Sequence, residues 1–145
     1  MVLLNKEINK IIIVCLLLIA FVVGWRGYVQ IYIKDGWERI KVGGVIVKVL
    51  VRNTVEGRRR GLSGYEKLEK NEGMLFVFPV ALRHGFWMKD MNFDLDFVWI
   101  KDNRVMELVE GVVAPKKDEK PVWVWPKIKV DKVLEVNSGW VEKNK

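Results

Sequence analysis

Apolar and polar residues alternate along several short stretches of this chain. Four valines at alternate positions of 45–52 share one face of a predicted strand, and the stretch 93–100 also has a period of two. The stretch 74–78 is almost entirely apolar, which predicts a strand buried on both faces and ended by Pro79. Short strands separated by turns are typical of an antiparallel β-sandwich or barrel.

Turn and capping residues divide these strands and add one short helix. The Asp-Gly pair at positions 35 and 36 predicts a hairpin turn between the alternating stretches 28–33 and 37–42. The Asn-Thr pair at 53 and 54 is suited to cap a short helix that carries three arginines. Polar residues at 101–104 predict a further turn between strands.

The amino-terminal region differs from the rest because residues 11–23 are uninterruptedly apolar. A span from Ile8 to Tyr28 reaches the length of a membrane helix if Lys10 and Arg26 extend their charges outward. We expect residues 1–28 to be an N-terminal transmembrane helix that acts as a signal-anchor, and residues 29–145 to form the β domain. A cleaved signal peptide and a buried core helix are the alternatives.

The expected location is the cell membrane, with a single pass and the C-terminal domain outside the cytoplasm. More positive charges follow the apolar segment than precede it, which by itself favours the opposite orientation, but long domains are translocated regardless of such counts. The membrane is therefore one expected partner, through the N-terminal helix.

Composition adds a basic character, with a net charge of +7. This charge favours anionic partners, although the lysines and arginines are scattered along the chain as on an ordinary solvated surface. The single cysteine, Cys15, permits neither an intramolecular disulfide nor a cysteine zinc site. Abundant Lys, Glu and Val with almost no Gln is typical of a thermophile.

Five motifs occur in an order and spacing that resemble a known family. They are Gly61-Leu62, Gly73-Met74-Leu75-Phe76-Val77-Phe78, Phe86-Trp87-Met88-Lys89, Leu95-Asp96 and Val133-Leu134-Glu135 with Gly139. Together they resemble the DUF192 family over about residues 45–140. The resemblance implies a compact, mainly β, jelly-roll-like domain with a short helix, often exported or membrane-attached, and no established function. The chain departs from the family pattern at Asp90-Met91, where Asn-Thr is usual, and at Asp94, where Pro is usual.

Polar residues at or beside these motifs form the candidate site. They are Arg60, His84, Trp87, Lys89, Asp96 and Glu135. If a β-sandwich gathers them at one end, they would bind an unidentified small or anionic ligand. The alternative is a buried ion-pair cluster, because a carboxylate that alternates with core aromatics, as Asp96 does, needs a partner.

Metal and covalent chemistry have little support in the sequence. One histidine and no usable cysteine exclude the ordinary zinc ligand sets, and the carboxylates lack a calcium-loop spacing. We therefore expect no metal, no cofactor and no catalytic residue. The enzymatic alternative is a small cell-envelope hydrolase, acting on a glycan or an ester, that uses Asp96 and Glu135 as acid and base.

Tryptophans offer a separate binding surface. Trp87, Trp123 and Trp125 would form a stacking face for sugar rings or bases, unless they simply pack over the end of the domain. The leading hypothesis is a non-catalytic, extracytoplasmic ligand-binding or interaction module. A nucleic-acid or anionic-lipid binder is a further alternative, although an extracytoplasmic location argues against nucleic acid. The sequence does not define an oligomeric state.

Overall fold

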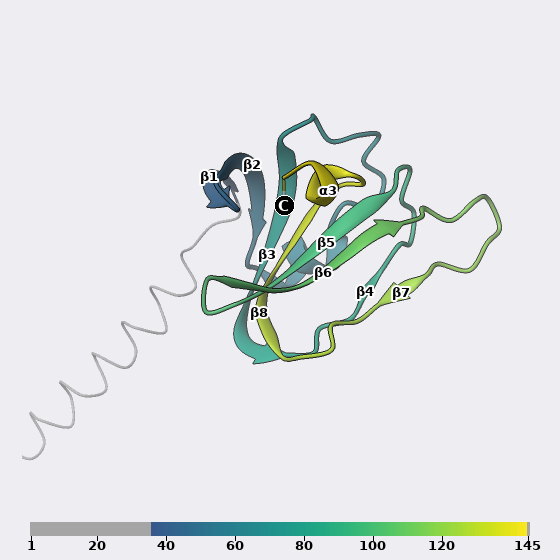
Figure 1. The fold of residues 1–145 in the computed structure, drawn as a ribbon. Coiled ribbons are helices and arrows are strands. Elements are labelled where there is room, and N and C mark those ends of the chain that lie inside the picture. Colours follow the sequence, from purple (N-terminus) through teal and green to yellow (C-terminus); the bar gives the residue numbers. More distant parts are fainter. Residues whose placement is uncertain (1–35, 145) are drawn as a thin grey trace, which may run out of the picture. The chain divides into compact units, whose positions relative to one another are not determined.

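The computed structural model describes residues 36–144, which form a six-stranded mixed β-sheet, a two-stranded ribbon and two short helices (Figure 1). In chain order the elements are β1 (Gly36–Val42), β2 (Val45–Arg52), α2 (Val55–Arg60), β3 (Glu72–Leu82), β4 (Phe86–Trp87), β5 (Leu95–Lys101), β6 (Arg104–Val112), β7 (Trp123–Val124), β8 (Val130–Asn137) and α3 (Trp140–Asn144). The strand order of the sheet is β1-β2-β3-β8-β5-β6, and β4 pairs with β7 in the ribbon.

Three predictions fall before the described residues. They are the transmembrane helix within residues 1–28, the domain boundary after residue 28 and the strand at 28–33. Within residues 36–144, no helix has the length and apolar character needed to cross a membrane.

The sheet begins with a tight hairpin at Gly43 and Gly44. These residues have φ values of +56° and +91°, in the left-handed region that a two-residue turn between antiparallel strands requires. The same geometry recurs between β5 and β6, where Asp102 and Asn103 have φ values of +49° and +61°. The predicted turn at 101–104 is therefore confirmed.

The expectation of a wholly antiparallel sheet is wrong, because β2 and β3 are parallel. Parallel neighbours need a crossover connection, and here the connection contains α2. The predicted cap is confirmed at Thr54, whose hydroxyl accepts a 3.0 Å hydrogen bond from the Gly57 backbone N–H. The domain is thus mainly β, with a mixed sheet and a short helix.

The strand that contains Pro79 is longer than predicted. β3 continues to Leu82, and its register with β8 shifts between Val77 and Leu82. Pro79 lies in this irregular portion, where its missing N–H disrupts no regular ladder hydrogen bond. The register shift explains why the proline does not end the strand.

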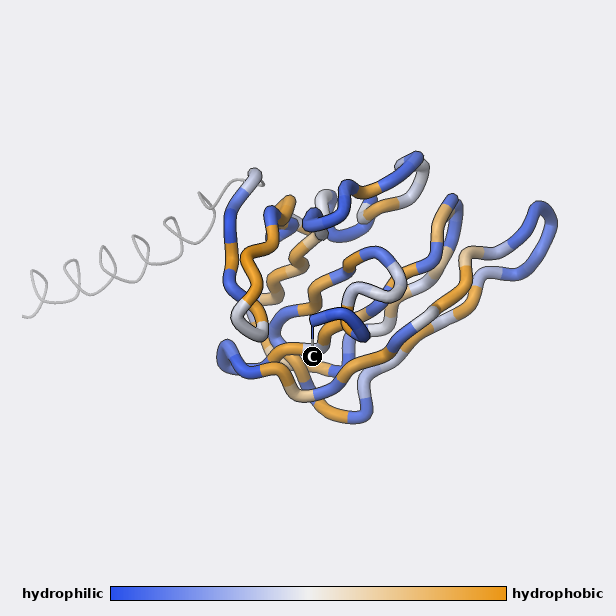
Figure 2. The backbone as a smooth tube through the Cα atoms, turned by 45° about the horizontal axis from the view of Figure 1, so that its top comes forward, coloured by the Kyte–Doolittle hydropathy of each residue, from blue (hydrophilic) through white to orange (hydrophobic). Residues whose placement is uncertain are grey.

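The central strands carry apolar side chains on both faces of the sheet. On the ribbon-side face, Phe97 and Trp99 of β5 pack with residues of the ribbon, including Val124. On the α3-side face, Val98 of β5 packs with Trp140 of α3. Figure 2 shows hydrophobic positions along the strands, whereas the loop between β6 and β7 is hydrophilic. The period of two predicted for 93–100 is therefore present, but both faces of β5 are covered.

Candidate ligand-binding site

Asp96 is fully buried on the α3-side face of β5. Its two carboxylate oxygens accept hydrogen bonds from the backbone N–H groups of Gly111, at 2.8 Å, and Val141, at 3.0 Å. These donors belong to β6 and α3, so Asp96 ties both elements to β5. A buried carboxylate that accepts backbone hydrogen bonds through both oxygens has a structural role.

Glu135 lies on the ribbon-side face of β8, because its neighbours Leu134 and Val136 both pack on the α3 side. It pairs in the sheet with Met74 and Phe97, and only 5% of its surface is exposed. Among residues 36–144 its carboxyl group has no hydrogen-bond or ion-pair partner. Desolvation raises the pKa of Glu135 to about 8, so this carboxyl group is mainly protonated at neutral pH.

Asp96 and Glu135 therefore project from opposite faces of one sheet. An acid–base pair for glycoside hydrolysis must place both carboxyl groups on either side of one scissile bond. The layer of the sheet itself separates these two groups, so they do not form such a pair.

Arg60 and His84 are also placed apart from the buried carboxylates. Arg60 is exposed at the end of α2. His84 stacks on Phe78 with ring centroids 3.6 Å apart, and its Nε2 lies 3.1 Å from the Val80 carbonyl oxygen. The arginine near the Phe78 ring is Arg58, with its guanidinium carbon 5.2 Å from the ring centroid. His84 thus covers an aromatic side chain at the edge of the core.

Two of the six predicted residues, Trp87 and Lys89, do lie together. The Lys89 ammonium nitrogen is 5.3 Å from the Trp87 ring centroid, within the range of a cation–π contact. Trp87 in turn contacts Trp123, at a centroid distance of 5.3 Å, and Trp123 contacts Trp125 at 5.8 Å with nearly parallel planes. We call these three tryptophans the Trp row.

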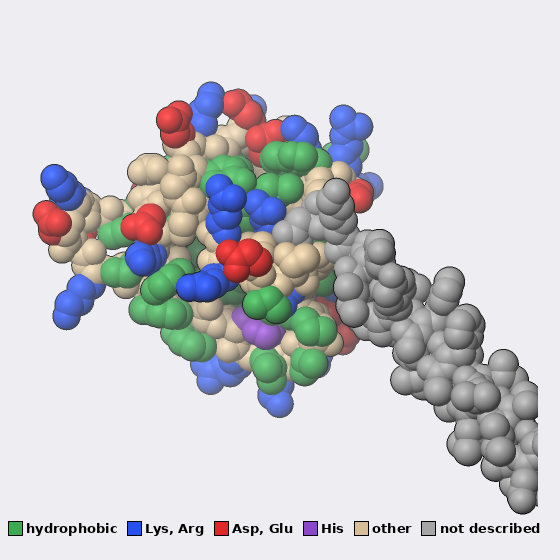
Figure 3. Space-filling model, turned by 180° about the vertical axis from the view of Figure 1, so that it is seen from behind, with side chains coloured by type: hydrophobic (Ala, Val, Ile, Leu, Met, Phe, Trp, Pro, Cys, Tyr) green, Lys and Arg blue, Asp and Glu red, His purple; other side chains and the backbone are tan. Residues whose placement is uncertain are grey.

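The Trp row remains open to solvent. Trp87 is 43% exposed, and Trp123 and Trp125 are each 53% exposed. Figure 3 shows hydrophobic side chains gathered on the back of the molecule over β4 and β7. Trp123 and Trp125 lie on the same side of their extended segment, and they are far less covered than core residues. A contiguous exposed aromatic surface of this kind is a candidate interaction site.

The ribbon displays the Trp row because its two sides differ. Trp87 and Trp123 are cross-strand partners that face outward, whereas Phe86 and its partner Val124 turn toward the ribbon-side core. Phe86 anchors the ribbon by edge-to-face contacts with core aromatics, including Trp99 at 5.7 Å. The packing of the inward side holds the outward tryptophans in place.

Gly85 provides the space that Trp125 occupies. A Cβ atom at position 85 would come within 2.5 Å of the Trp125 indole ring. The ring therefore lies directly against the backbone just before β4, which fixes one end of the Trp row.

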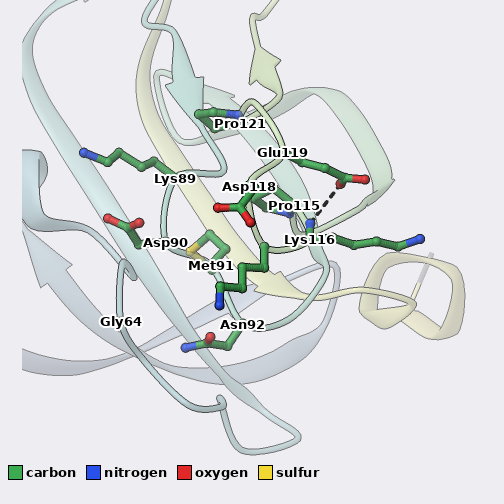
Figure 4. Close-up of a pocket in the computed structure, with 11 residues that line it drawn as sticks. Gly64, Lys89, Asp90, Met91, Asn92, Pro115, Lys116, Asp118, Glu119 and Pro121 are labelled. Carbon is green, nitrogen blue, oxygen red and sulfur yellow. Dashed lines mark hydrogen bonds between the residues drawn. The ribbon is translucent and has the colours of Figure 1, made fainter.

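A groove of about 630 Å³ opens next to the Trp row. Its walls come from residues 89–92, which follow β4, and from residues 115–121, which precede β7. In Figure 4, Lys89 and Asp90 lie on one side of the groove, and Asp118 and Glu119 on the other. The candidate site inferred from the sequence does not include the charged loop at 116–120. The sequence feature that marks this loop is the pair of prolines that bound it, Pro115 and Pro121.

Hydrogen bonds hold both walls of the groove. The 89–92 wall is joined to the connection after α2 by three bonds, which are Ser63 Oγ to the Lys89 carbonyl at 2.9 Å, Gly64 N–H to the Asp90 carbonyl at 2.8 Å and Asn92 Nδ2 to the Tyr65 carbonyl at 2.8 Å. The opposite wall has a turn in which the Lys116 N–H donates to a Glu119 carboxylate oxygen at 2.9 Å. Each wall of the groove is thus held locally by hydrogen bonds of its own.

The described residues offer no assembled metal site. Within 36–144, no group of three or more His, Cys, Asp or Glu side chains is arranged to hold an ion. The carboxylates considered from the sequence have other roles, since Asp94 accepts a hydrogen bond from the Ala114 N–H at 2.8 Å and Asp96 bonds the backbone as described above.

The fold and site together define a small mixed-β domain with an exposed aromatic row beside a polar groove. Residues 38–145 match the DUF192 family, which is described as Uncharacterized ACR, and the chain belongs to this family. The resemblance inferred from the five sequence motifs is therefore confirmed. No functionally curated protein matches the sequence.

Two solved structures share this fold. A putative transcription regulator from Sinorhizobium meliloti 1021 is 26% identical, with a TM-score of 0.65, over 77% of this chain and 88% of that one. A protein of unknown function from Novosphingobium aromaticivorans DSM 12444 is 25% identical, with a TM-score of 0.61, over 72% of this chain and 74% of that one. These similarities support the fold, and the function has to be inferred from the site.

Proposed function

We propose that this DUF192 protein is a non-catalytic, membrane-anchored module that binds glycans outside the cytoplasm through the Trp row. The observation that carries the proposal is the contact of Trp87, Trp123 and Trp125 in one row while each stays about half exposed. The apolar segment at 11–23 supports membrane attachment.

Sugar rings are suitable ligands for such a surface. A pyranose ring presents axial C–H groups on its faces, and these pack against the electron-rich face of an indole. Its hydroxyl groups remain at the rim, where they keep hydrogen bonds to water or to polar side chains. A rigid aromatic surface also loses little side-chain entropy on binding.

The enzymatic alternative has less support. Asp96 is committed to two backbone hydrogen bonds, and Glu135 lies on the other face of the sheet. Neither carboxyl group belongs to the Trp row or lines the groove beside it. The hydrolase considered as the alternative would need a different pair of residues.

Glycan binding can be tested with the full-length protein in detergent micelles. Titration with linear oligosaccharides, followed by calorimetry, should give measurable affinity that falls at least about tenfold in the Trp123→Ala variant. Trp37→Ala is a matched control, because Trp37 on β1 is 49% exposed but lies outside the Trp row. Circular dichroism should confirm that both variants stay folded.

Two results would contradict glycan binding at the Trp row. One is the absence of binding to every neutral or acidic glycan in a broad array. The other is an equal loss of affinity in the Trp37→Ala and Trp123→Ala variants, which would indicate non-specific adsorption to exposed indoles.

Location is tested separately by protease treatment of intact cells that express the protein. An extracytoplasmic domain should be cleaved without lysis, whereas a cytoplasmic reporter should survive. Full protection of the domain in intact cells, with cleavage after lysis, would refute this orientation.

A further inference from the structure

We propose that the groove is a second, polar subsite continuous with the Trp row, and that the ligand is a linear, uncharged glycan that occupies both. This inference rests on the proposed glycan-binding function. It adds the location of a second contact region, the chain form of the ligand and its charge.

The geometry of the ribbon joins the two regions. β4 and β7 pair at Trp87 and Trp123, and the Met88 N–H then donates to the Val122 carbonyl at 2.9 Å. Beyond this bond the two segments diverge and become the opposite walls of the groove. A ligand that follows the Trp row in this direction is therefore led between the walls.

Lys89 belongs to both regions. Its ammonium group lies over Trp87, and the residue also lines the groove. In Figure 4 its side chain extends away from Asp118 and Glu119. Lys89 is thus placed at the junction of the two regions, where its N–H groups can donate to the hydroxyls of a sugar that passes from the Trp row into the groove.

The charges of the groove favour an uncharged ligand. Its lining contains equal numbers of cationic and anionic side chains, which are Lys89, Lys116 and Lys117 with Asp90, Asp118 and Glu119. A balanced lining offers no net attraction to a polyanion such as a uronic-acid polymer or a nucleic acid. Hydroxyl groups, by contrast, can donate to carboxylates and accept from ammonium groups. The net charge of +7 for the whole chain therefore does not describe this site.

A linear ligand follows from the arrangement of the contacts. The Trp row offers flat apolar surfaces, and the groove beyond it offers hydrogen-bonding groups between two walls. A short oligosaccharide would reach only one region, whereas a longer chain gains contacts in both without a second loss of translational freedom. Affinity should therefore increase with chain length.

The test uses full-length protein and β-1,4-linked glucose and N-acetylglucosamine oligomers from disaccharide to hexasaccharide. The groove variant combines Lys117→Ala with Asp118→Asn; asparagine tolerates the positive φ of +69° found at position 118. The matched control combines Lys101→Ala with Asp102→Asn in the β5–β6 turn, where the aspartate φ is +49°. Both variants change the same residue types in an exposed turn.

We expect the wild-type affinity for one of these series to rise at least about tenfold from disaccharide to hexasaccharide. The control should keep this gain, whereas the groove variant should keep the disaccharide affinity and lose most of the gain. If the groove variant keeps the full increase in affinity with chain length, the groove is not a subsite and the Trp row alone is the binding site. Equal affinity for polygalacturonate and a neutral oligomer would overturn the preference for uncharged chains. If the Trp123→Ala variant instead binds every oligomer as tightly as the wild type does, the proposed function itself is refuted.

Discussion

Replacement of Glu135 by glutamine should make the domain more stable at high pH and almost unchanged at low pH. The wild-type residue is 5% exposed, between Met74 and Phe97, and its carboxyl group has no partner among the described residues. Glutamine has nearly the same shape and stays neutral at every pH. The substitution therefore removes a titrating group. It breaks no hydrogen bond or ion pair of the described structure.

The sign of the effect follows from the direction of the pKa shift. Burial raises the pKa of Glu135 from 4.5 to about 8. Below pH 4.5 both folded and unfolded states are protonated, so the stability of the wild type is complete. Between pH 4.5 and about 8 only the unfolded state releases the proton, and stability falls as the pH rises.

The size of the effect is set by the width of this interval. The difference between about 8 and 4.5 is roughly 3.5 pH units, and each unit corresponds to about 1.4 kcal/mol. The free energy of unfolding of the wild type, relative to the variant, should thus fall by at most about 5 kcal/mol, an amount comparable to the total stability of many domains. Water entry beside the ionised group would reduce the loss.

Urea unfolding at a series of pH values measures this difference, with tryptophan fluorescence as the signal. The variant-minus-wild-type free energy should be near zero at acidic pH and increase steadily to about pH 8. Glu66→Gln, in which the replaced residue is exposed, is the control and should show a much smaller pH dependence. A flat difference between the Glu135→Gln variant and the wild type across the whole range would show that Glu135 is solvated or paired, and would refute the argument.

Two substitutions extend these predictions. Asp96→Asn should lower the free energy of unfolding by about 1–3 kcal/mol in urea titrations, because asparagine has only one acceptor oxygen for the two N–H donors that bond the buried carboxylate. Asp94→Asn, at an exposed position with one such bond, should have a smaller effect, and equal effects would contradict the structural role of Asp96. Gly85→Ala should displace the Trp125 ring, which a Cβ would approach to 2.5 Å, and weaken glycan binding several-fold with little change in the unfolding midpoint. Unaltered binding by a folded Gly85→Ala protein would show that the position of Trp125 does not matter.

Local patterns predicted the elements of the fold better than their arrangement. The period of two in 93–100 corresponds to β5, and the Asn-Thr pair caps α2 as expected, because both signals depend on neighbouring residues. The parallel pairing of β2 with β3 depends on where the chain returns after α2, and no local pattern encodes that direction. The expectation that Pro79 ends the strand is wrong for a similar reason, because the register shift that accommodates it involves a strand distant in sequence.

The candidate site was predictable only in part. Asp96 and Glu135 both belong to family motifs. The motifs do not show, however, whether residues on two different strands lie on the same face of the sheet. Trp123 and Trp125 could be paired from their spacing, whereas the contact of Trp123 with Trp87 depends on cross-strand register. The groove depends on the divergence of two segments about thirty residues apart in the chain, which sequence patterns do not show.

The ribbon that carries the Trp row has few backbone hydrogen bonds of its own. β4 and β7 contain two residues each and pair only with one another, outside the six-stranded sheet. Elements with so few ladder bonds open locally at a much lower free energy than a central strand does. Backbone amides of the ribbon should therefore exchange with deuterium well before those of β5 and β8, and a ligand lying across both strands would slow this exchange. Amide exchange in the ribbon would then report ligand binding directly.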